Sequence, residues 1–90
     1  MMAWKIVYLP AAERDLAELD ATVRKRILKF IDQRIANLEN PRMIGEPLHG
    51  RDLGNFWKYR VGDYRIVCDI HDKEVRIVVV KIGNRKEVYR

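Results

Sequence analysis

The sequence has a single cysteine and no long apolar run. One cysteine, Cys68, excludes a disulfide within the chain. The longest apolar runs, Ile6 to Leu9 and Ile77 to Val80, fall far short of the roughly 20 residues that cross a bilayer. The N-terminus also lacks a signal-peptide core followed by a small-residue cleavage site. The sequence therefore predicts a cytoplasmic protein with no membrane partner.

Metal-ligating and phosphate-cradling patterns are missing as well. The two histidines, His49 and His71, lie at separate predicted turns and have no partners at ligand spacing. No glycine-rich loop opens a predicted helix, so we expect neither a metal nor another cofactor. His49 can titrate near neutrality and act as an acid or base, although a hydrogen bond within its loop is the simpler interpretation.

The composition predicts one small folded domain with a basic surface. Ninety residues with 48% hydrophobic and 34% charged content suit a single domain spanning residues 1–90, because the chain is too short for two cores and too apolar for disorder. The formal net charge of +5 favours an anionic partner. Charge alone does not distinguish a nucleic acid from an acidic protein.

The N-terminal half predicts a strand and a helix hairpin. The apolar stretch from Trp4 to Leu9 predicts a strand covered on both faces, which Pro10 ends while starting a helix. The apolar positions of that helix are Ala12, Leu16 and Leu19. Asp20 is suited to cap a second helix that ends at Asn40-Pro41. Its apolar stripe consists of Val23, Ile27, Phe30, Ile31, Ile35 and Leu38. Both helices can therefore cover one side of a sheet.

Two features of this half have more than one interpretation. The outer side of the second helix carries a basic cluster of Arg24, Lys25, Arg26 and Lys29, which suits a solvated face, RNA phosphates or an acidic partner. Arg42 to Asn55 has the composition of a loop, punctuated by glycine and proline. Its length is typical of loops with a function, so we expect it to border a binding site.

The stretch from Phe56 to Val67 predicts a β-hairpin. Two runs of alternating residues flank Gly62-Asp63, a two-residue loop whose first position requires positive φ. This loop places Arg60 opposite Arg65 on the paired strands. One face of the hairpin is then apolar and is assigned to the core: Trp57, Tyr59, Val61, Tyr64, Ile66 and Cys68. Cys68 is accordingly interpreted as a small core residue and not as a nucleophile.

The other face of the hairpin gathers Lys58, Arg60 and Arg65. Like charges opposite one another destabilise a strand pair, so their presence indicates an anionic ligand, whereas composition alone would favour a solvated surface. Asp72-Lys73 predicts the next turn, and Val75 to Ile82 predicts a central strand with Asp69 opposite Arg76. That strand would return the C-terminal residues to the basic face.

The order of these elements carries a family resemblance. Together with Pro47-Leu48, the run from Trp57 to Arg65, Gly83-Asn84-Arg85 and Val88-Tyr89-Arg90, it resembles the RelE/ParE family of bacterial toxins over essentially the whole chain. The resemblance implies an α+β fold with an N-terminal strand, a two-helix hairpin and a three-stranded antiparallel meander packed on the helices. In that family an antitoxin wraps around each toxin. The RelE branch cuts messenger RNA in the ribosomal A site, and the ParE branch acts on DNA gyrase.

The resemblance also implies a catalytic set of Lys58, Arg60, Arg65, Arg85 and Tyr89. Lys58 and Arg60 match two cationic positions, Arg65 the phosphate-holding arginine, Arg85 the general acid, and Tyr89 a residue that stacks on or orients the substrate. Arginine is a poor base, so Lys58 is the candidate base, and neighbouring positive charge would lower its pKa.

Two positions depart from the family pattern. Arg60 replaces a second lysine, and Asn84 stands where many relatives have histidine, which favours activity that depends on the ribosome. Gyrase inhibition and a non-catalytic RNA-binding or ribosome-binding module remain as alternatives.

Overall fold

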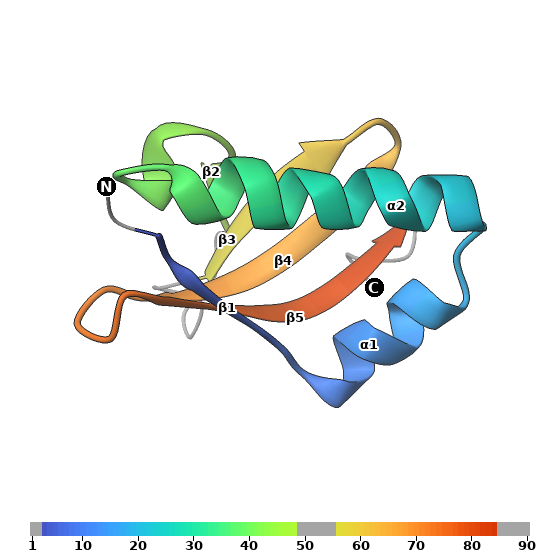
Figure 1. Cartoon of the computed structure of the whole chain (residues 1–90), viewed down its shortest axis with the longest axis horizontal. Coiled ribbons are helices and arrows are strands. Elements are labelled where there is room, and N and C mark those ends of the chain that lie inside the picture. Colours follow the sequence, from blue (N-terminus) through green and yellow to red (C-terminus); the bar gives the residue numbers. More distant parts are fainter. Residues whose placement is uncertain (1–2, 49–55, 85–90) are drawn as a thin grey trace.

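A computed structural model describes residues 3–48 and 56–84 of the chain, so the expectations for His49, Arg85 and Tyr89 lie outside the described residues. The N-terminal elements are β1 (Lys5–Tyr8), α1 (Pro10–Ala17) and α2 (Ala21–Lys29), which continues as the π-helical η1 (Phe30–Arg34) and the 3-10 helix η2 (Ile35–Asn37). A second 3-10 helix, η3 (Pro41–Met43), precedes the strands β2 (Glu46–Pro47), β3 (Phe56–Val61), β4 (Tyr64–His71) and β5 (Arg76–Asn84) (Figure 1).

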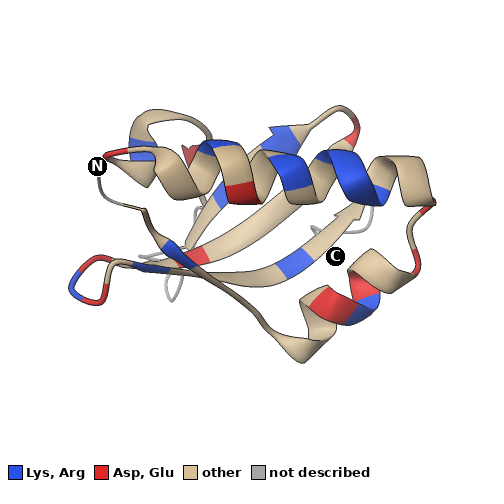
Figure 2. Ribbon diagram, viewed as in Figure 1, with Lys and Arg blue, Asp and Glu red and all other residues tan. Residues whose placement is uncertain are grey.

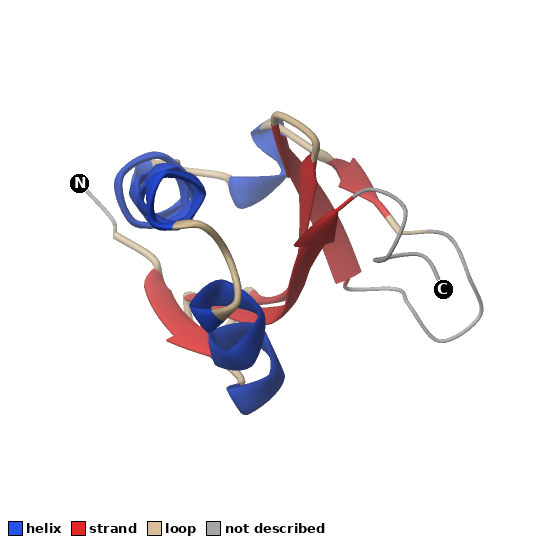
Figure 3. Ribbon diagram, turned by 90° about the vertical axis from the view of Figure 1, so that its right-hand side faces the viewer, coloured by secondary structure: helices blue, strands red, loops and turns tan. Residues whose placement is uncertain are grey.

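The strands form one mixed sheet in the order β1-β5-β4-β3-β2. β1 is parallel to β5, and the other neighbours are antiparallel. Both helices lie on the same side of the curved sheet (Figure 3). This arrangement confirms the α+β fold with a helix hairpin packed on an antiparallel meander. No helix in the described ranges is long and apolar enough to cross a membrane.

The helix hairpin follows from its capping and apolar residues. Pro10 occupies the first turn of α1, and the Asp20 carboxylate accepts a hydrogen bond of 3.1 Å from the Thr22 amide at the start of α2. Arg24 donates to the carbonyls of Leu16 and Leu19, which joins α2 to the end of α1. The predicted stripe is confirmed, with Ile27, Ile31 and Ile35 fully buried. Of the predicted basic cluster, Lys25, Arg26 and Lys29 are exposed, whereas Arg24 is half-buried between the helices, so the prediction is wrong for Arg24 (Figure 2).

The β3–β4 hairpin has the predicted register throughout. Gly62 has a φ of 59° in the two-residue loop. The paired residues run from Val61 with Tyr64 to Phe56 with Asp69. Tyr59 is 1% exposed and donates a 2.6 Å hydrogen bond to the carbonyl of Pro41. The hairpin therefore fixes both the core face and the position of η3.

The predicted pairing of Asp69 with Arg76 is wrong. Asp69 lies opposite Val78, because the turn spans residues 72–75 and not two residues. The backbone carbonyl of Asp72 accepts a hydrogen bond of 3.2 Å from the Val75 amide, and its carboxylate accepts bonds of 2.8 and 3.0 Å from the Arg42 guanidinium. A two-residue loop would not provide these contacts. The shift is by two residues, so the same face of β5 still points into the core.

Two further predictions are wrong in part. β1 lies at an edge of the sheet with half-buried residues, so it is not covered on both faces. The predicted loop from Arg42 contains η3 and the short strand β2, whose Glu46 pairs with Lys58 of β3. A two-residue strand shows no alternation, and proline is tolerated at a sheet edge because its missing N–H faces no partner.

Gly45 sets the approach to β2. Its φ is +82°, and a Cβ atom there would meet the Lys58 carbonyl, the Trp57 indole nitrogen at 2.7 Å and Tyr59 Cδ1 at 2.9 Å. At Gly62, by contrast, the first neighbour of a Cβ would be Arg26 Nη1 at 3.4 Å. Only glycine therefore fits at position 45, for reasons of both conformation and space.

Gly45→Ala is expected to lower the free energy of unfolding by about 2–4 kcal/mol, since backbone strain and overpacking add. The matched control Gly62→Ala has the positive φ but has space, so about 1 kcal/mol is expected. Urea unfolding of the isolated protein measures both values. Equal costs at the two positions would contradict the steric account of Gly45.

Tyr59→Phe is expected to cost about 1–3 kcal/mol, because the substitution leaves the Pro41 carbonyl without its buried donor. The same unfolding experiment checks it. Tyr64→Phe is the control, since the Tyr64 hydroxyl makes no hydrogen bond within the described part of the chain, and should change stability by less than about 0.5 kcal/mol. An unchanged free energy of unfolding for Tyr59→Phe would show that this hydrogen bond does not anchor η3.

Candidate functional site

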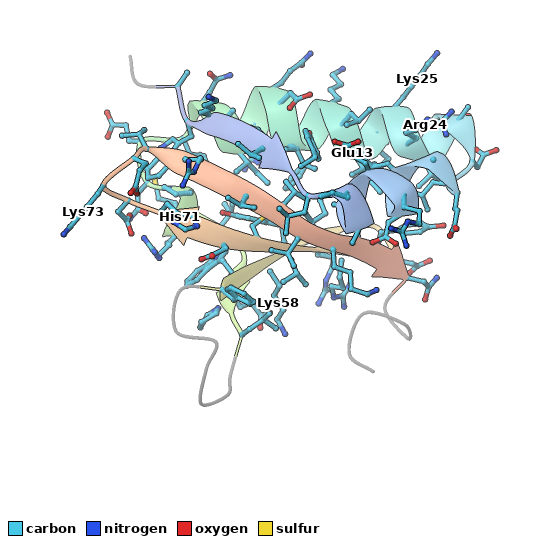
Figure 4. The ribbon with its side chains drawn as sticks, turned by 90° about the horizontal axis from the view of Figure 1, so that it is seen from below. Glu13, Arg24, Lys25, Lys58, His71 and Lys73 are labelled. Carbon is cyan, nitrogen blue, oxygen red and sulfur yellow. The ribbon has the colours of Figure 1, made fainter. Side chains whose placement is uncertain are left out.

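The three cations of the hairpin lie on the face of the sheet that the helices leave uncovered. Successive side chains of a strand alternate between faces, and Tyr59 and Ile66 point into the core. In Figure 4, Lys58 lies on the side of the sheet opposite α2. The pairing of Arg60 with Arg65 across the strands is as predicted. β3 and β4 thus bring the basic residues together by register alone.

A small hollow of about 70 Å³ marks this cluster, lined by Gly45, Glu46, Lys58, Tyr59, Arg60 and Arg65. Arg65 is only 7% exposed, whereas Arg60 is exposed. No hydrogen bond or ion pair of Arg65 is found among residues 3–48 and 56–84. A buried charge is costly unless it is paired. The hollow is therefore suited to an anion that would pair with Arg65.

Glu46 is a member of the site that sequence analysis missed. Its Oε2 lies 3.6 Å from Lys58 Nζ, with 61% of the Glu46 side chain and 23% of the Lys58 side chain exposed. A pair this exposed contributes little to stability. Its consequence is chemical, because it places a proton acceptor beside the cations. The one signal in the sequence was the position of Glu46 directly before Pro47-Leu48.

The other candidate residues, Cys68 and His71, lie outside this hollow. Cys68 is fully buried, and desolvation raises the pKa of its thiol, which confirms it as a core residue. His71 ends β4 and its Nε2 lies 3.1 Å from Asp69 Oδ2, outside the hollow. Within the described ranges no group of three or more histidine, cysteine, aspartate or glutamate residues could hold a metal ion.

The end of β5 relates the C-terminal candidates to this site. Gly83 pairs with Arg65, and Asn84, the last described residue, pairs with Tyr64. The chain therefore leaves the sheet beside the hairpin loop. Arg85 and Tyr89 are not described, so their membership of the site stays a prediction. Lys58, Arg60 and Arg65 are brought together as the sequence predicted.

This arrangement has a limited chemical repertoire. Three cations around one hollow can bind a phosphate group and stabilise additional negative charge on it. The Glu46 carboxylate can accept a proton, and a protonated Lys58 can donate one. The site has the groups for acid-base chemistry at a phosphodiester and the cations to bind one.

Known proteins resemble the chain over nearly its whole length. Residues 6–89 match the family model of the ParE toxin of type II toxin-antitoxin systems, parDE. Toxin RelE of Mycobacterium tuberculosis is 31% identical over 87 residues, which cover 97% of this chain and 87% of that protein. The mRNA interferase toxin RelE of Escherichia coli is 30% identical over 90 residues, covering 98% of this chain and 92% of the relative.

Solved structures share the fold. The toxin-antitoxin complex RelBE2 from Mycobacterium tuberculosis contains a chain that superposes with a TM-score of 0.83 at 24% identity, covering 97% of both chains. The isolated RelE toxin of Escherichia coli gives a TM-score of 0.72 at 23% identity, covering 97% of this chain and 92% of that one. The family expected from the sequence motifs is confirmed: the chain belongs to the RelE/ParE family of toxins of type II toxin-antitoxin systems.

Proposed function

We propose that this toxin is a ribosome-dependent endoribonuclease that cuts messenger RNA in the A site without a metal ion. The observation that carries the proposal is the burial of Arg65, which has no hydrogen bond or ion pair within residues 3–48 and 56–84, in a hollow shared with Lys58 and Arg60. A scissile phosphate is the anion that would complete this hollow. The Escherichia coli relative, named an mRNA interferase, supports the assignment.

The chemistry is attack of a ribose 2′-oxygen on the adjacent phosphorus. The 2′-hydroxyl loses its proton to a base, the new P–O bond forms, and the bond to the 5′-oxygen breaks. A general acid protonates that oxygen, so the products are a 2′,3′-cyclic phosphate and a free 5′-hydroxyl. Arg65, Arg60 and Lys58 stabilise the added charge on the phosphate oxygens. By family resemblance Arg85 is the acid and Tyr89 stacks on or orients the nucleotide.

Two groups compete for the role of base. Lys58 can act only when deprotonated, and the Glu46 carboxylate 3.6 Å away stabilises its charged form. Glu46 faces the same hollow, and its carboxylate can accept a proton there. We assign the base to Glu46 and phosphate binding to Lys58, which revises the role expected for Lys58 from the sequence.

A cognate antitoxin is the second partner. The chain has the fold of toxins solved in RelBE2 and RelBE toxin-antitoxin complexes. A toxin acting on ribosomes would work in the cytoplasm, where a co-expressed antitoxin would mask the basic face or hold the C-terminal residues away from it, in an oligomeric complex.

Gyrase inhibition is the second candidate function. It is favoured by one observation, the match of residues 6–89 to the ParE toxin model. Inhibition by binding would not require a phosphate-sized hollow around a buried arginine. We therefore rank it below cleavage.

Arg65→Ala and Arg85→Ala are each expected to lower cleavage at least about 10²-fold, because each removes a group that acts on the phosphate or the leaving oxygen. Primer extension of messenger RNA on programmed ribosomes measures the cuts. Lys73→Ala, an exposed residue of the β4–β5 turn, is the matched control and should cut like the parent. Circular dichroism establishes that each variant is folded.

Three results of that assay would decide against the proposal. An absence of cuts by the folded, antitoxin-free toxin would remove the enzyme and lead to a gyrase supercoiling assay. Cutting by the Arg65→Ala variant at the parent rate would remove the hollow as the site. Loss of ribosome binding in proportion to lost charge would indicate a non-catalytic module.

The pH dependence of cutting separates the two bases. With Lys58 as base, the rate should rise between pH 6 and 9, because only the deprotonated amine accepts a proton and the neighbouring carboxylate stabilises its charged form. With Glu46 as base, cutting does not require a deprotonated Lys58, so this rise should be absent. Single-turnover cutting by Glu46→Gln and Lys58→Met is the companion measurement. A rising profile that Lys58→Met abolishes would return the role to Lys58.

A further inference from the structure

A second basic hollow lies on the helix side of the sheet, between the long helix and the tip of the β3–β4 hairpin. It is a groove of about 680 Å³. Exposed polar side chains line its rim: Arg26, Lys29, Gln33, Arg34, Asn37 and Arg60. Basic residues are spaced along this helix and at the neighbouring end of β3 (Figure 2). No carboxylate from the described part of the chain lines the groove, so its charge is uniformly positive.

A π-helical turn in the long helix brings two of these cations toward one side. Within η1 the amide of Ile35 donates to the carbonyls of both Phe30 and Ile31, so the turn is widened to a π-helix. A bond between residues five apart brings Lys29 and Arg34 toward one side. In an unbroken α-helix, positions five apart are rotated from one another by about 140°. π turns are rare and occur frequently at functional sites.

The basic rim of the groove favours a polyanion over a protein helix. Phe30, Leu38 and Val61 form an apolar floor, and the exposed side chains above that floor carry only positive charge or amide groups. An amphipathic helix binds a groove through apolar side chains that it buries there. A nucleic acid binds through phosphates that displace counterions from exposed lysine and arginine residues. The exposed side chains of this groove match the second mode.

The groove is continuous with the candidate cleavage site. Arg60 lines both the groove and the hollow that contains Arg65. β2 pairs with β3 only at Trp57 and Lys58, and no other described strand lies along that side of β3. Within residues 3–48 and 56–84, no strand therefore covers the edge at Arg60 and Val61. A chain bound at Arg65 can pass around this edge into the groove without crossing a described strand.

We propose that this groove binds single-stranded RNA, namely the message continuing from the cleavage site. The proposal rests on the proposed function, because the RNA in the groove is the same molecule whose phosphate occupies the hollow. Arg26, Lys29, Arg34 and Arg60 bind successive phosphates, and the amides of Gln33 and Asn37 donate hydrogen bonds to phosphate or base. Contacts of this kind carry little base specificity. The groove therefore adds affinity that depends on RNA length.

The test uses fluorescent 2′-O-methyl oligouridylates of 4 and 12 nucleotides, which cannot be cleaved because the 2′-oxygen is blocked. Fluorescence anisotropy at several KCl concentrations gives their affinities for the full antitoxin-free chain. The groove variant is Lys29→Gln with Arg34→Gln. The control, Lys25→Gln with Lys73→Gln, removes the same charge from exposed positions outside the groove. All four residues are exposed, so both variants are expected to fold.

The 12-nucleotide probe should bind the parent more tightly than the 4-nucleotide probe. The groove variant should lose about tenfold of the longer probe's affinity at low salt, and the slope of its logarithmic salt dependence should fall by roughly 1.4. The short probe should bind all three proteins alike. The control should bind the long probe within about twofold of the parent.

Three outcomes would overturn the inference. An equal loss of affinity in the control variant would show that RNA binding depends only on net charge. Equal affinity of the two probes for the parent would show that no RNA enters the groove. Unchanged RNA binding by the groove variant, with weakened binding of an acidic amphipathic peptide, would show a protein-docking groove. The assay contains no ribosome and no cleavable RNA, so length-dependent binding without cutting in primer extension would reject the cleavage proposal alone.

Discussion

The two-residue turn at Gly62-Asp63 is the constraint on which the rest of the molecule depends. Side chains alternate along β3 and β4, so a slip of one residue in their pairing would carry Tyr59 to the outer face and Arg60 into the core. Gly62 prevents that slip by adopting a φ of 59°, which suits a primed hairpin turn whose twist matches the strands. The same register that seals Tyr59 against η3 also sets Lys58, Arg60 and Arg65 around one hollow. Core and site are two consequences of one turn.

The free-energy cost of clustering cations is offset by apolar burial on the opposite face of the same strands. Arg60 and Arg65 are directly opposite one another, which destabilises the strand pair, and burial of Arg65 adds a desolvation cost. The reverse side of β3, β4 and β5 is covered by the helix hairpin, with Ile27, Ile31, Ile35 and Ile66 fully buried. Burial of side chains of this size contributes roughly 1.5–3 kcal/mol each. The core therefore offsets the repulsion between the clustered cations.

The sequence predicted features that depend on local rules and missed those that depend on tertiary contacts. The hairpin register, the Asp20 cap and the apolar stripe follow from turn chemistry, capping and periodicity, and all three are confirmed. The β4–β5 turn departs from the prediction because Arg42, distant in sequence, binds Asp72, while Val75 takes a φ of 49° that no turn rule selects for a β-branched residue. Glu46 entered the site through a strand too short to show alternation, and the π turn carries no sequence signature of its own.

The short length of β2 affects the hollow, the groove and the position of Glu46. If β2 extended past Glu46–Pro47 toward the hairpin loop, a strand would cover the edge of β3 at Arg60 and separate the hollow from the groove. Gly45 stops this extension, because its φ of 82° turns the chain away and its close approach to Lys58 and Trp57 leaves no room for a side chain. Glu46, whose carboxylate lies beside Lys58, thus directly follows Gly45, which ends the pairing of β2 along β3. In the proposed reaction, proton transfer at the phosphate and access for a longer RNA would both depend on where this short strand ends.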